Sequence, residues 1–596
     1  MHKKANHIFV IFLTLLQIPL IVYCLYLLHL WFQGTCPNKD FLSWDGDLRF
    51  IKTIGMMDSL RDGRIFDFIV LVFDSPTWPI LRNLIQVVVF FILGHSQEVD
   101  VYITFFTFVL ILFLFAHILF YSIEKNKFLY PLLFFLSWNL LLDTRPILVY
   151  MFTAMLEVQG GFFFLLTSYY IVIFFQNQYN DKYLLYKLSF SFIALLFTKH
   201  PYGYMQVFSL AILSLSLSFK ESKLLVIEYF LYLKSNFYKN IQIILAVLLI
   251  TAYIILGKAY LTGKLPLYIK YSIALLLTLD FYIFLFKNKD KFFGKGLKQT
   301  WNLMIWVVLP IVFWILIHPD RFASSSGTLA HIQTEGHQVG VLVERGLDYY
   351  LLYFKSLVYD SFGNTILGMI LLIAMLFSLL RGGFLYFKYN IVQAHFIYSF
   401  LCMVGIMGLT LLTPNHQVRH LYHIYPTLII IIAFLLDDLF QWNKIVAGLL
   451  IIFITAMLSY FSFQNIQSKY SFNLCFTDTN RDVFKLPRWV SENVKNSLTT
   501  NSILVNRIDP FHLNKPDTEL MMTIHAYNNR VKLLTDPKRH IKNKNGFSSL
   551  YVIGNTCSGV DGAGDLIKTI YAIKPLQAIQ SEFACIEIYG LNSKTK

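Results

Sequence analysis

Long apolar runs separated by short, lysine-bearing polar segments recur from the N-terminus to about residue 464 of this 596-residue chain. Runs of roughly 18 to 25 residues are long enough for a helix to cross a ~30 Å hydrocarbon core. The pattern therefore predicts a mainly α-helical, polytopic membrane domain over residues 1–464, with about thirteen spans. The first run, Ile8–Phe32, is too long for a signal-peptide core and lacks a small-residue cleavage site, so we expect a retained anchor.

Lysine and arginine residues in the short loops predict the orientation of the spans, because cytoplasmic loops retain positive charge. Lys3 and Lys4 place the N-terminus in the cytoplasm and residues 34–79 outside, as a first outer loop. A second outer loop covers residues 318–363. The later predicted crossings are Val101–Ser122, Phe128–Leu142, Ile147–Phe175, Leu188–Thr198, Tyr204–Phe219, Ile241–Leu256, Tyr268–Phe286, Trp301–Ile317, Ile366–Leu380, Ile391–Leu412, Tyr422–Leu436 and Ile445–Phe463.

Two shorter apolar patterns in the N-terminal part differ from the spans. In the first outer loop, apolar residues recur every third position among polar neighbours, at Leu48, Ile51, Ile54, Met57 and Leu60. This spacing predicts an amphipathic helix lying in the membrane interface. The run Ile80–Leu93 is apolar but short, which indicates a second interfacial or half-inserted helix.

From about residue 465 the composition becomes that of a soluble domain, which we expect to be a small α/β domain over residues 465–596. The β-branched and aromatic runs at 502–505, 531–534, 550–553 and 585–588 predict strands, and 482–496 and 565–573 predict helices. In the predicted topology this domain is outside the cytoplasm, where disulfides form. The first expected pair is Cys557 with Cys585.

The composition supports a membrane protein and argues against nucleic-acid binding. Only 14% of the residues are charged, against about 25% in soluble domains. The net charge of +15 comes from lysines grouped in the loops between apolar runs, as membrane topology requires, so no nucleic-acid partner is expected.

The stretch SWDGDLRF, residues 43–50, holds the first candidates for chemistry. Asp45 and Asp47 are two carboxylates separated by one glycine, close to the end of the first apolar run, and Arg49 follows them. One interpretation is helix capping, in which an aspartate accepts hydrogen bonds from free backbone N–H groups. The other is catalytic: one carboxylate acts as general base on a hydroxyl, and the other orients a substrate or binds a divalent cation such as Mg²⁺ or Mn²⁺. Capping explains one aspartate better than two.

Ionisable residues also gather at the predicted outer ends of other spans. They are Asp143 and Arg145, Lys199 and His200, and Arg419, while Glu157 is expected about three turns into the predicted span that begins at Ile147. Each has a structural alternative: Arg145 pairs with Asp143, Lys199 extends its amine to the interface, or a buried partner neutralises Glu157. Together they suggest a cationic outer pocket suited to a phosphate or diphosphate.

Other sequence signatures are absent or weak. His331, Glu335 and His337 have no spacing typical of a metal site, and a solvated loop is the preferred interpretation. The chain has no G-x-x-x-x-G-K-[ST] run and no G-x-S-x-G elbow, so neither a P-loop ATPase nor an α/β-hydrolase is expected. No nucleotide cofactor is expected.

With these features the chain resembles the GT-C superfamily of polytopic glycosyltransferases, and within it family 39, which includes protein O-mannosyltransferases and lipid A aminoarabinose transferases. The resemblance rests on the acidic pair in the first outer loop and on three short motifs, which are DSPTWPIL at 74–81, FTKHP at 197–201 and RHLYHIYP at 419–426. Family 39 usually has an adjacent Asp-Glu pair, whereas here Gly46 separates Asp45 from Asp47.

The resemblance implies transfer of a sugar from a polyprenyl-phosphate donor to a lipid, glycan or protein acceptor at the outer face of the membrane. It makes Asp45 the candidate base, with Asp47 as its partner. Lys199 and Arg419 become candidate phosphate ligands, with Arg82 and Arg145 as weaker ones.

A transporter or lipid flippase is the main alternative from another class. Transporters place ionisable residues near the bilayer midplane on discontinuous helices of repeated halves. Glu157 and Asp280 are candidates for such charges, but no internal repeat is visible. A third alternative, a membrane scaffold for envelope assembly, explains the outer domain but not the acidic first loop. The short loops and lysine-rich inner faces favour a bacterial inner membrane.

Overall fold

The computed structural model describes residues 17–19, 21–30, 44–73, 79–95, 97–122, 129–176, 182–217, 227, 229, 231–232, 295–317, 346–412, 417–468, 489, 493, 502–506, 549–554, 557, 576–582 and 585–590. The chain forms two compact units, which are Met1–Tyr169 with Ser191–Gln206 and Ile311–Lys596, and Tyr170–Phe190 with Val207–Pro310. All contacts described below lie within the first unit.

The described residues of the N-terminal half are mainly helical, as the hydrophobic pattern predicts. Residues 17–19 and 21–30 are helical within the first apolar run. The following helices are α2 (Trp44–Arg61), α3 (Ile65–Phe73), α4 (Leu81–Leu93), α5 (Gln97–Ser122), α6 (Tyr130–Asp143), α7 (Arg145–Tyr150), α8 (Glu157–Gln176), α9 (Lys182–Thr198) and α10 (His200–Leu217).

The second half continues with long helices and ends in a sheet. The helices are α14 (Lys295–Ile317), α16 (Leu347–Tyr359), α17 (Thr365–Tyr389), α18 (Ala394–Leu412), the 3₁₀ helix η3 (Val418–His423), α19 (Ile424–Trp442) and α20 (Lys444–Ser468). Within the described residues, five helices are long and apolar enough to cross a membrane and five more apolar helices are shorter. The multi-pass, mainly helical architecture is thus confirmed.

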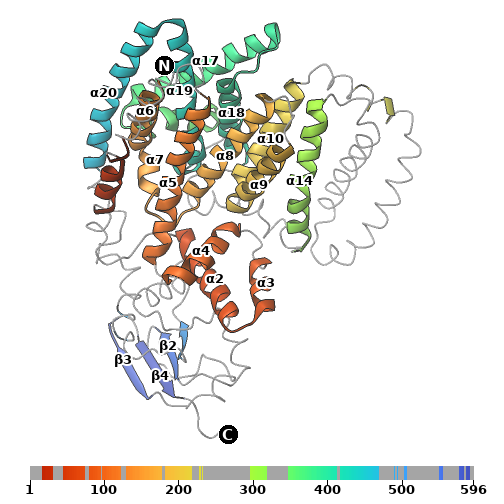
Figure 1. Ribbon diagram of the computed structural model, residues 1–596. Coiled ribbons are helices and arrows are strands. Elements are labelled where there is room, and N and C mark those ends of the chain that lie inside the picture. The colour runs from red at the N-terminus through yellow and green to blue at the C-terminus, as the bar shows by residue number, and fades with distance from the viewer. Residues whose placement is uncertain are drawn as a thin grey trace, which may run out of the picture. The chain divides into compact units, whose positions relative to one another are not determined.

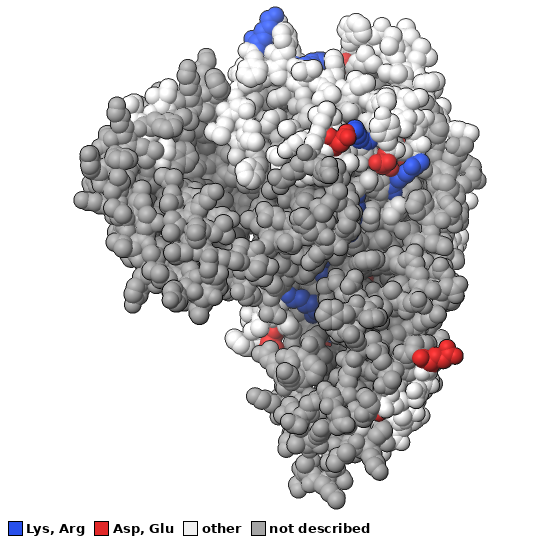
Figure 2. All heavy atoms as spheres, turned by 180° about the vertical axis from the view of Figure 1, so that it is seen from behind, with Lys and Arg blue, Asp and Glu red and all other residues white. Residues whose placement is uncertain are grey.

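Helix α19 is the central helix of the described bundle, because its side chains from Ile424 to Phe434 are all buried. It packs against α6, α17, α18 and α20, and α6 packs against α20 (Figure 1). On the face drawn in Figure 2, the described side chains of the helical part are mostly uncharged, with a few lysine, arginine, aspartate and glutamate side chains among them. A surface of this kind suits contact with lipid.

Helices α2, α3 and α4 form a separate small cluster beside α5. The buried face of α2 includes Phe50, Ile54 and Met57, which share a core with Phe90 of α4 and Trp314 of α14. The predicted helix over this part of the first outer loop is therefore present. It begins at Trp44, so that Asp45 and Asp47 stand in its first turn instead of before it. Their side chains lie outside the described residues.

One predicted span is wrong in a way that matters for the site. The run Ile147–Phe175 is not a single helix, because α7 ends at Tyr150 and α8 begins at Glu157, with turns and bends between them. Glu157 is therefore the first residue of a helix instead of lying three turns inside one. Residues 151–156 contain neither glycine nor proline, so the sequence gives no local signal for the break.

Among the described C-terminal residues, four strands form a sheet in the order β1-β2-β4-β3. Strands β1 (Ser502–Asn506), β2 (Ser549–Gly554) and β4 (Cys585–Gly590) match predicted strands, while β3 (Gln577–Gln580) was not predicted. Strand β1 pairs with β2 in parallel, and the other pairs are antiparallel. The predicted disulfide between Cys557 and Cys585 is confirmed, with the two Cα atoms 5.3 Å apart. The predicted strand at 531–534 and helix at 565–573 lie outside the described residues, as does most of the helix at 482–496.

Candidate functional site

Three ionisable side chains from distant parts of the chain meet at one place. The Nζ atom of Lys199 lies 2.6 Å from Oε1 of Glu157 and donates a hydrogen bond to it. The Nε atom of Arg419 lies 4.0 Å from the same oxygen. We call Glu157, Lys199 and Arg419 the ionic cluster. Its members were all predicted as site residues from sequence, and the structure brings them together.

Each member stands at the end of a helix, which explains why polar groups occur here among apolar runs. Glu157 opens α8, where a carboxylate is stabilised by the free N–H groups of the first turn. Lys199 is the single residue between α9 and α10, and Pro201 follows as the second residue of α10, a position that proline favours. Arg419 belongs to η3, directly before α19. The predicted chain break at Lys199 is confirmed.

Two cations lie against one carboxylate in the ionic cluster. The exposed fractions are 3% for Glu157, 16% for Lys199 and 15% for Arg419. Lysine and arginine are the side chains that bind phosphate oxygens best. Each of them has more N–H donors than its contact with Glu157 uses. The arrangement is therefore suited to binding a phosphate group as well.

Aromatic residues form a wall beside the cluster. Lys199 Nζ lies 5.0 Å from the centre of the Tyr202 ring, within the range of a cation–π contact. The Tyr202 hydroxyl donates to the backbone oxygen of His420 at 3.1 Å, and its ring centre is 4.0 Å from that of His423. The hydroxyl of Tyr353 lies 3.3 Å from Nδ1 of His420. These contacts fix η3 and the start of α10 around Lys199.

Two glycines in the first turn of α8 make this close packing feasible. A Cβ atom added at Gly160 would lie 2.7 Å from the ring of Tyr202, and one added at Gly161 would lie 2.8 Å from the ring of Tyr422. Both tyrosines are fully buried. Sequence reasoning missed these glycines, although a Gly-Gly pair inside a span is itself a signal of close helix contact.

Helix α2 touches the segment that leads into Glu157. The Nη2 atom of buried Arg49 donates a hydrogen bond to the backbone oxygen of Ala154 at 3.0 Å. Ala154 stands in the break between α7 and α8, three residues before Glu157. Position 45 is one helical turn before Arg49, hence on the same face of α2. The motif at residues 43–50 is thus anchored to the chain segment that carries the cluster.

Arg82 has a structural partner. Its Nη2 atom lies 2.6 Å from Oδ1 of Asp100, and both side chains are fully buried. The same oxygen accepts a hydrogen bond from Gln86, which in turn accepts one from Thr53 of α2. Asn83 donates to the backbone oxygen of Arg49. This network holds α2 against α4 and α5. It was not predicted, because its central acceptor Asp100 lies just before Val101, where the predicted span begins.

Asp143 and Arg145 fasten another helix junction. The backbone N–H of Arg145 donates to the oxygen of Ser361 at 2.9 Å, and Thr144 forms a bridge with Phe362. Burial raises the pKa of Asp143, the residue after the predicted span 128–142, to about 6, although a backbone N–H of Gly363 and the charge of Arg145 oppose this shift. The Arg145 side chain is exposed.

The remaining predicted residues are placed as follows. Buried His200 opens α10 and its ring stacks on that of Tyr204 at 6.3 Å. Tyr150 ends α7, and residues 151–156 separate it from Glu157. Within the described residues no group of three or more His, Cys, Asp or Glu side chains is suited to a metal ion. His331, Glu335 and His337 lie outside the described residues.

Comparison with solved structures found similar chains, whereas no protein-family model and no curated protein sequence matches. The crystal structure of ArnT from Cupriavidus metallidurans in the apo state aligns over 96% of this chain and 97% of its own, with 11% identity and a TM-score of 0.46. The same protein bound to undecaprenyl phosphate gives the same coverage and TM-score at 10% identity. The archaeal oligosaccharyltransferase AglB from Archaeoglobus fulgidus, in complex with an inhibitory peptide and a dolichol-phosphate, aligns over 90% of this chain and 69% of its own, with 10% identity and a TM-score of 0.43. Because these TM-scores are below 0.5, the function proposed below rests on the geometry of the site.

Proposed function

We propose that the chain is an integral-membrane glycosyltransferase that transfers a sugar from a polyprenyl-phosphate-linked donor to a hydroxyl or amine of a lipid, glycan or protein acceptor. The observation that supports this most is the meeting of Lys199 and Arg419 on the single carboxylate of Glu157. Lys199 and Arg419 are 220 positions apart in the chain, and the fold brings both cations together beside the aromatic wall. A lipid-linked phosphate is an anion that reaches such a place from the bilayer.

In this proposal the phosphate of the donor binds to Lys199 and Arg419. Their positive charges stabilise the charge that develops on the leaving phosphate as the bond between the sugar carbon and the phosphate oxygen breaks. The acceptor oxygen or nitrogen attacks the same carbon from the opposite side, and Asp45 takes its proton as general base. Asp47 orients the acceptor. Arg82 is left out of the phosphate site because its partner is Asp100.

Asp45 is linked to this chemistry through helix α2. The bond from Arg49 to Ala154 anchors the first turns of α2 to the segment before Glu157, and position 45 shares the face of Arg49. Asp45 is therefore connected to Glu157 by one turn of α2, one hydrogen bond and three residues of chain. Glu157 in turn contacts the proposed phosphate ligands Lys199 and Arg419.

Replacing Asp45 by asparagine tests the assignment. The full chain is reconstituted in vesicles with a panel of polyprenyl-phosphate-linked hexoses and pentoses, and release of polyprenyl phosphate is measured in a membrane extract that supplies acceptors. We expect Asp45→Asn to lower the rate at least 100-fold, the lower range for loss of a general base. Asp62→Asn is the matched control, since Asp62 pairs with Arg64 at the exposed turn after α2. Normal transfer by Asp45→Asn would show that Asp45 only stabilises the helix end.

A lipid flippase remains the second candidate, and the break between α7 and α8 favours it. Discontinuous helices with an ionisable residue at the break, here Glu157, are typical of transporter binding sites. Such a protein would move the lipid-linked sugar across the bilayer and leave the sugar–phosphate bond intact, so the release of polyprenyl phosphate separates the two functions.

We also propose a location in a bacterial inner membrane, with the N-terminus in the cytoplasm and residues 465–596 as a periplasmic domain. The disulfide between Cys557 and Cys585 supports an oxidising compartment for that domain. Alkylation of these two cysteines by a membrane-impermeant maleimide in sealed cells, only after reduction, is the expected result.

A further inference from the structure

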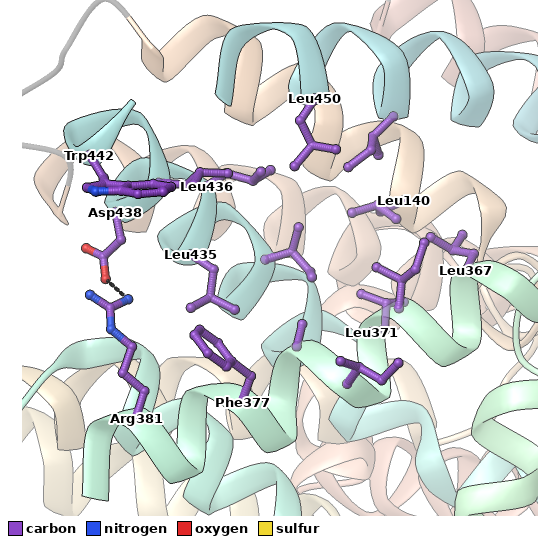
Figure 3. Close-up of a pocket in the computed structure, with 16 residues that line it drawn as sticks. Leu140, Leu367, Leu371, Phe377, Arg381, Leu435, Leu436, Asp438, Trp442 and Leu450 are labelled. Carbon is purple, nitrogen blue, oxygen red and sulfur yellow. Dashed lines mark hydrogen bonds and ion pairs between the residues drawn. The ribbon is translucent and has the colours of Figure 1, made fainter. Parts of the chain in front are cut away.

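A second feature, separate from the ionic cluster, lies among α6, α17, α19 and α20. These helices enclose a cavity of about 580 Å³, within the usual range of small-molecule sites. Its walls are hydrocarbon along most of their length, with Leu140, Leu367 and Leu371 towards one end and Leu435 and Phe377 further along (Figure 3). The other end carries Arg381, Asp438 and Trp442.

The cavity is open to the outside of the helical bundle. Its lining residues Ile373, Phe377 and Trp442 are 64%, 53% and 82% exposed. Helix α17 is apolar and long enough to cross a membrane, yet only 33% of its most apolar segment is buried. In a membrane protein such a surface faces lipid, so lipid chains are the molecules that reach the groove first.

The groove has the length and the polar end that a membrane lipid needs. Arg381 follows Leu367 by 14 residues on α17, roughly 21 Å along a helix, whereas one leaflet of hydrocarbon is about 15 Å deep. A tryptophan and an arginine at one level are typical of the membrane–water interface. A lipid chain of one leaflet therefore fits along the groove with its headgroup at Arg381.

At this end of the groove, Arg381 has more N–H donors than its ion pair with Asp438 uses. Arg381 Nη1 lies 2.8 Å from Oδ2 of Asp438, and Nε2 of His395 lies 3.3 Å from the same oxygen. His395 is fixed on its other side by Ser378, 2.6 Å from Nδ1. Asp438 is thus held by two partners. Because a guanidinium has five N–H donors, Arg381 can keep its bond to Asp438 and still donate to a phosphate.

We propose that this groove binds an anionic phospholipid of the bilayer, with one acyl chain between α17 and α19 and its phosphate on Arg381. A peptide is a poor occupant, because its backbone polar groups would find few partners along walls of leucine, isoleucine and phenylalanine. A zwitterionic headgroup such as phosphocholine would gain less from Arg381, because its own ammonium cation offsets the charge of its phosphate. The partly exposed side chain of Arg381 lies at the end of the groove (Figure 3).

The test compares headgroups and two opposite substitutions. Phosphatidylglycerol or phosphatidylcholine is titrated into the delipidated full chain in detergent, and bound lipid is counted by native mass spectrometry. We expect phosphatidylglycerol to bind more tightly, and Arg381→Gln to weaken it about tenfold, the size of one lost charge-assisted hydrogen bond. Asp438→Asn removes the competing carboxylate and is expected to strengthen it. Lys388→Gln is the control, a cation on the same helix that packs on Phe384 and Tyr389.

Opposite signs for Arg381→Gln and Asp438→Asn, together with a weakened site in the groove-filling variant Ala374→Trp, would support the proposal. Loss of binding in both charge variants would instead indicate that the ion pair only holds the helices together. Equal binding of the two lipids would make the groove a non-specific lipid contact, and stronger binding of polyprenyl phosphate that displaces phosphatidylglycerol would make it a donor site. Each of these three results would overturn the proposal.

Discussion

Replacing Glu157 by glutamine removes the carboxylate that lies against Lys199 and Arg419 while keeping the shape of the side chain. In the unmodified protein Lys199 Nζ donates to Glu157 Oε1 at 2.6 Å, and only 3% of the Glu157 side chain is exposed. The variant removes the negative charge that Glu157 places beside these two cations. We expect it to fold, because the amide oxygen of glutamine still accepts a bond from Lys199, but to be less stable.

The expected loss follows from the burial of the pair. Removing one partner of a buried ion pair costs about 3–5 kcal/mol, and the retained hydrogen bond favours the lower end of this range. Asp348→Asn is the control, since Asp348 and Lys355 form a pair that is 77% and 51% exposed, and such a pair contributes about 0–1 kcal/mol. Thermal unfolding of the detergent-solubilised full chain measures both.

The decisive measurement adds the proposed ligand. If Lys199 and Arg419 hold a phosphate, polyprenyl phosphate replaces the lost carboxylate and binds Glu157→Gln more tightly than the unmodified protein. A ligand at 100 times its dissociation constant stabilises by about 2.7 kcal/mol, which is enough to restore most of the loss. Polyprenol, which has the same chain without the phosphate, is expected to have little effect. Equal stabilisation of both proteins by polyprenyl phosphate, or by polyprenol in its place, would refute a phosphate site at these cations.

Two further predictions concern packing and protonation. Gly160→Ala is expected to destabilise the fold and to lower donor binding, because its Cβ would lie 2.7 Å from the ring of buried Tyr202. Gly448→Ala is the control. Its Cβ meets nothing within 4 Å, so this variant is expected to be neutral or slightly stabilising. Burial raises the pKa of Asp143 to about 6, so folding favours its protonated form. Its stabilising contribution is present below the pKa of the unfolded state and is lost as the pH rises through 6, with a slope of up to about 1.4 kcal/mol per pH unit. Asp143→Asn is expected to remove this dependence in unfolding measurements from pH 4 to 7, and to leave the protein more stable than the original at pH 7.

Both of these predictions have a clear contrary result. Equal stability of the Gly160 and Gly448 variants would mean that Tyr202 is free to move, and that the aromatic wall is not needed to hold Lys199. An unchanged pH profile in Asp143→Asn would mean that the pKa of Asp143 is the same in the folded and the unfolded protein.

Much of the helical part is predictable because hydrophobic periodicity and helix-end signals are local. Lys199 is an example: charged and polar residues followed by Pro201 interrupt an apolar run, and the structure breaks the helix there. The part of α2 from Leu48 to Leu60 and three of the four described strands follow from similar patterns. The meeting of Lys199 with Arg419 was an expectation from their common predicted face.

The position of Glu157 was mispredicted because its cause is tertiary. Residues 151–156 are compatible with a helix. One hydrogen bond in the break is local, from Thr153 to the backbone oxygen of Tyr150. Another is distant, because Arg49 donates to the backbone oxygen of Ala154. A prediction made from neighbouring residues does not include Arg49, which is 105 residues from Ala154 in the sequence. The same holds for Arg82, whose partner Asp100 stands at the start of a helix that extends further back than its apolar run.

The most direct test of the proposed function is whether the sugar leaves its lipid. The purified full chain is placed in vesicles with a polyprenyl-phosphate donor labelled in both sugar and lipid, and acceptors from a membrane extract are supplied. The proposal predicts that the sugar label moves to the acceptor, that free polyprenyl phosphate appears in equal amount, and that both fall together in Lys199→Gln and Arg419→Gln. If both labels instead cross the bilayer on an intact lipid-linked sugar, the chain is a transporter and the proposed transferase function is wrong.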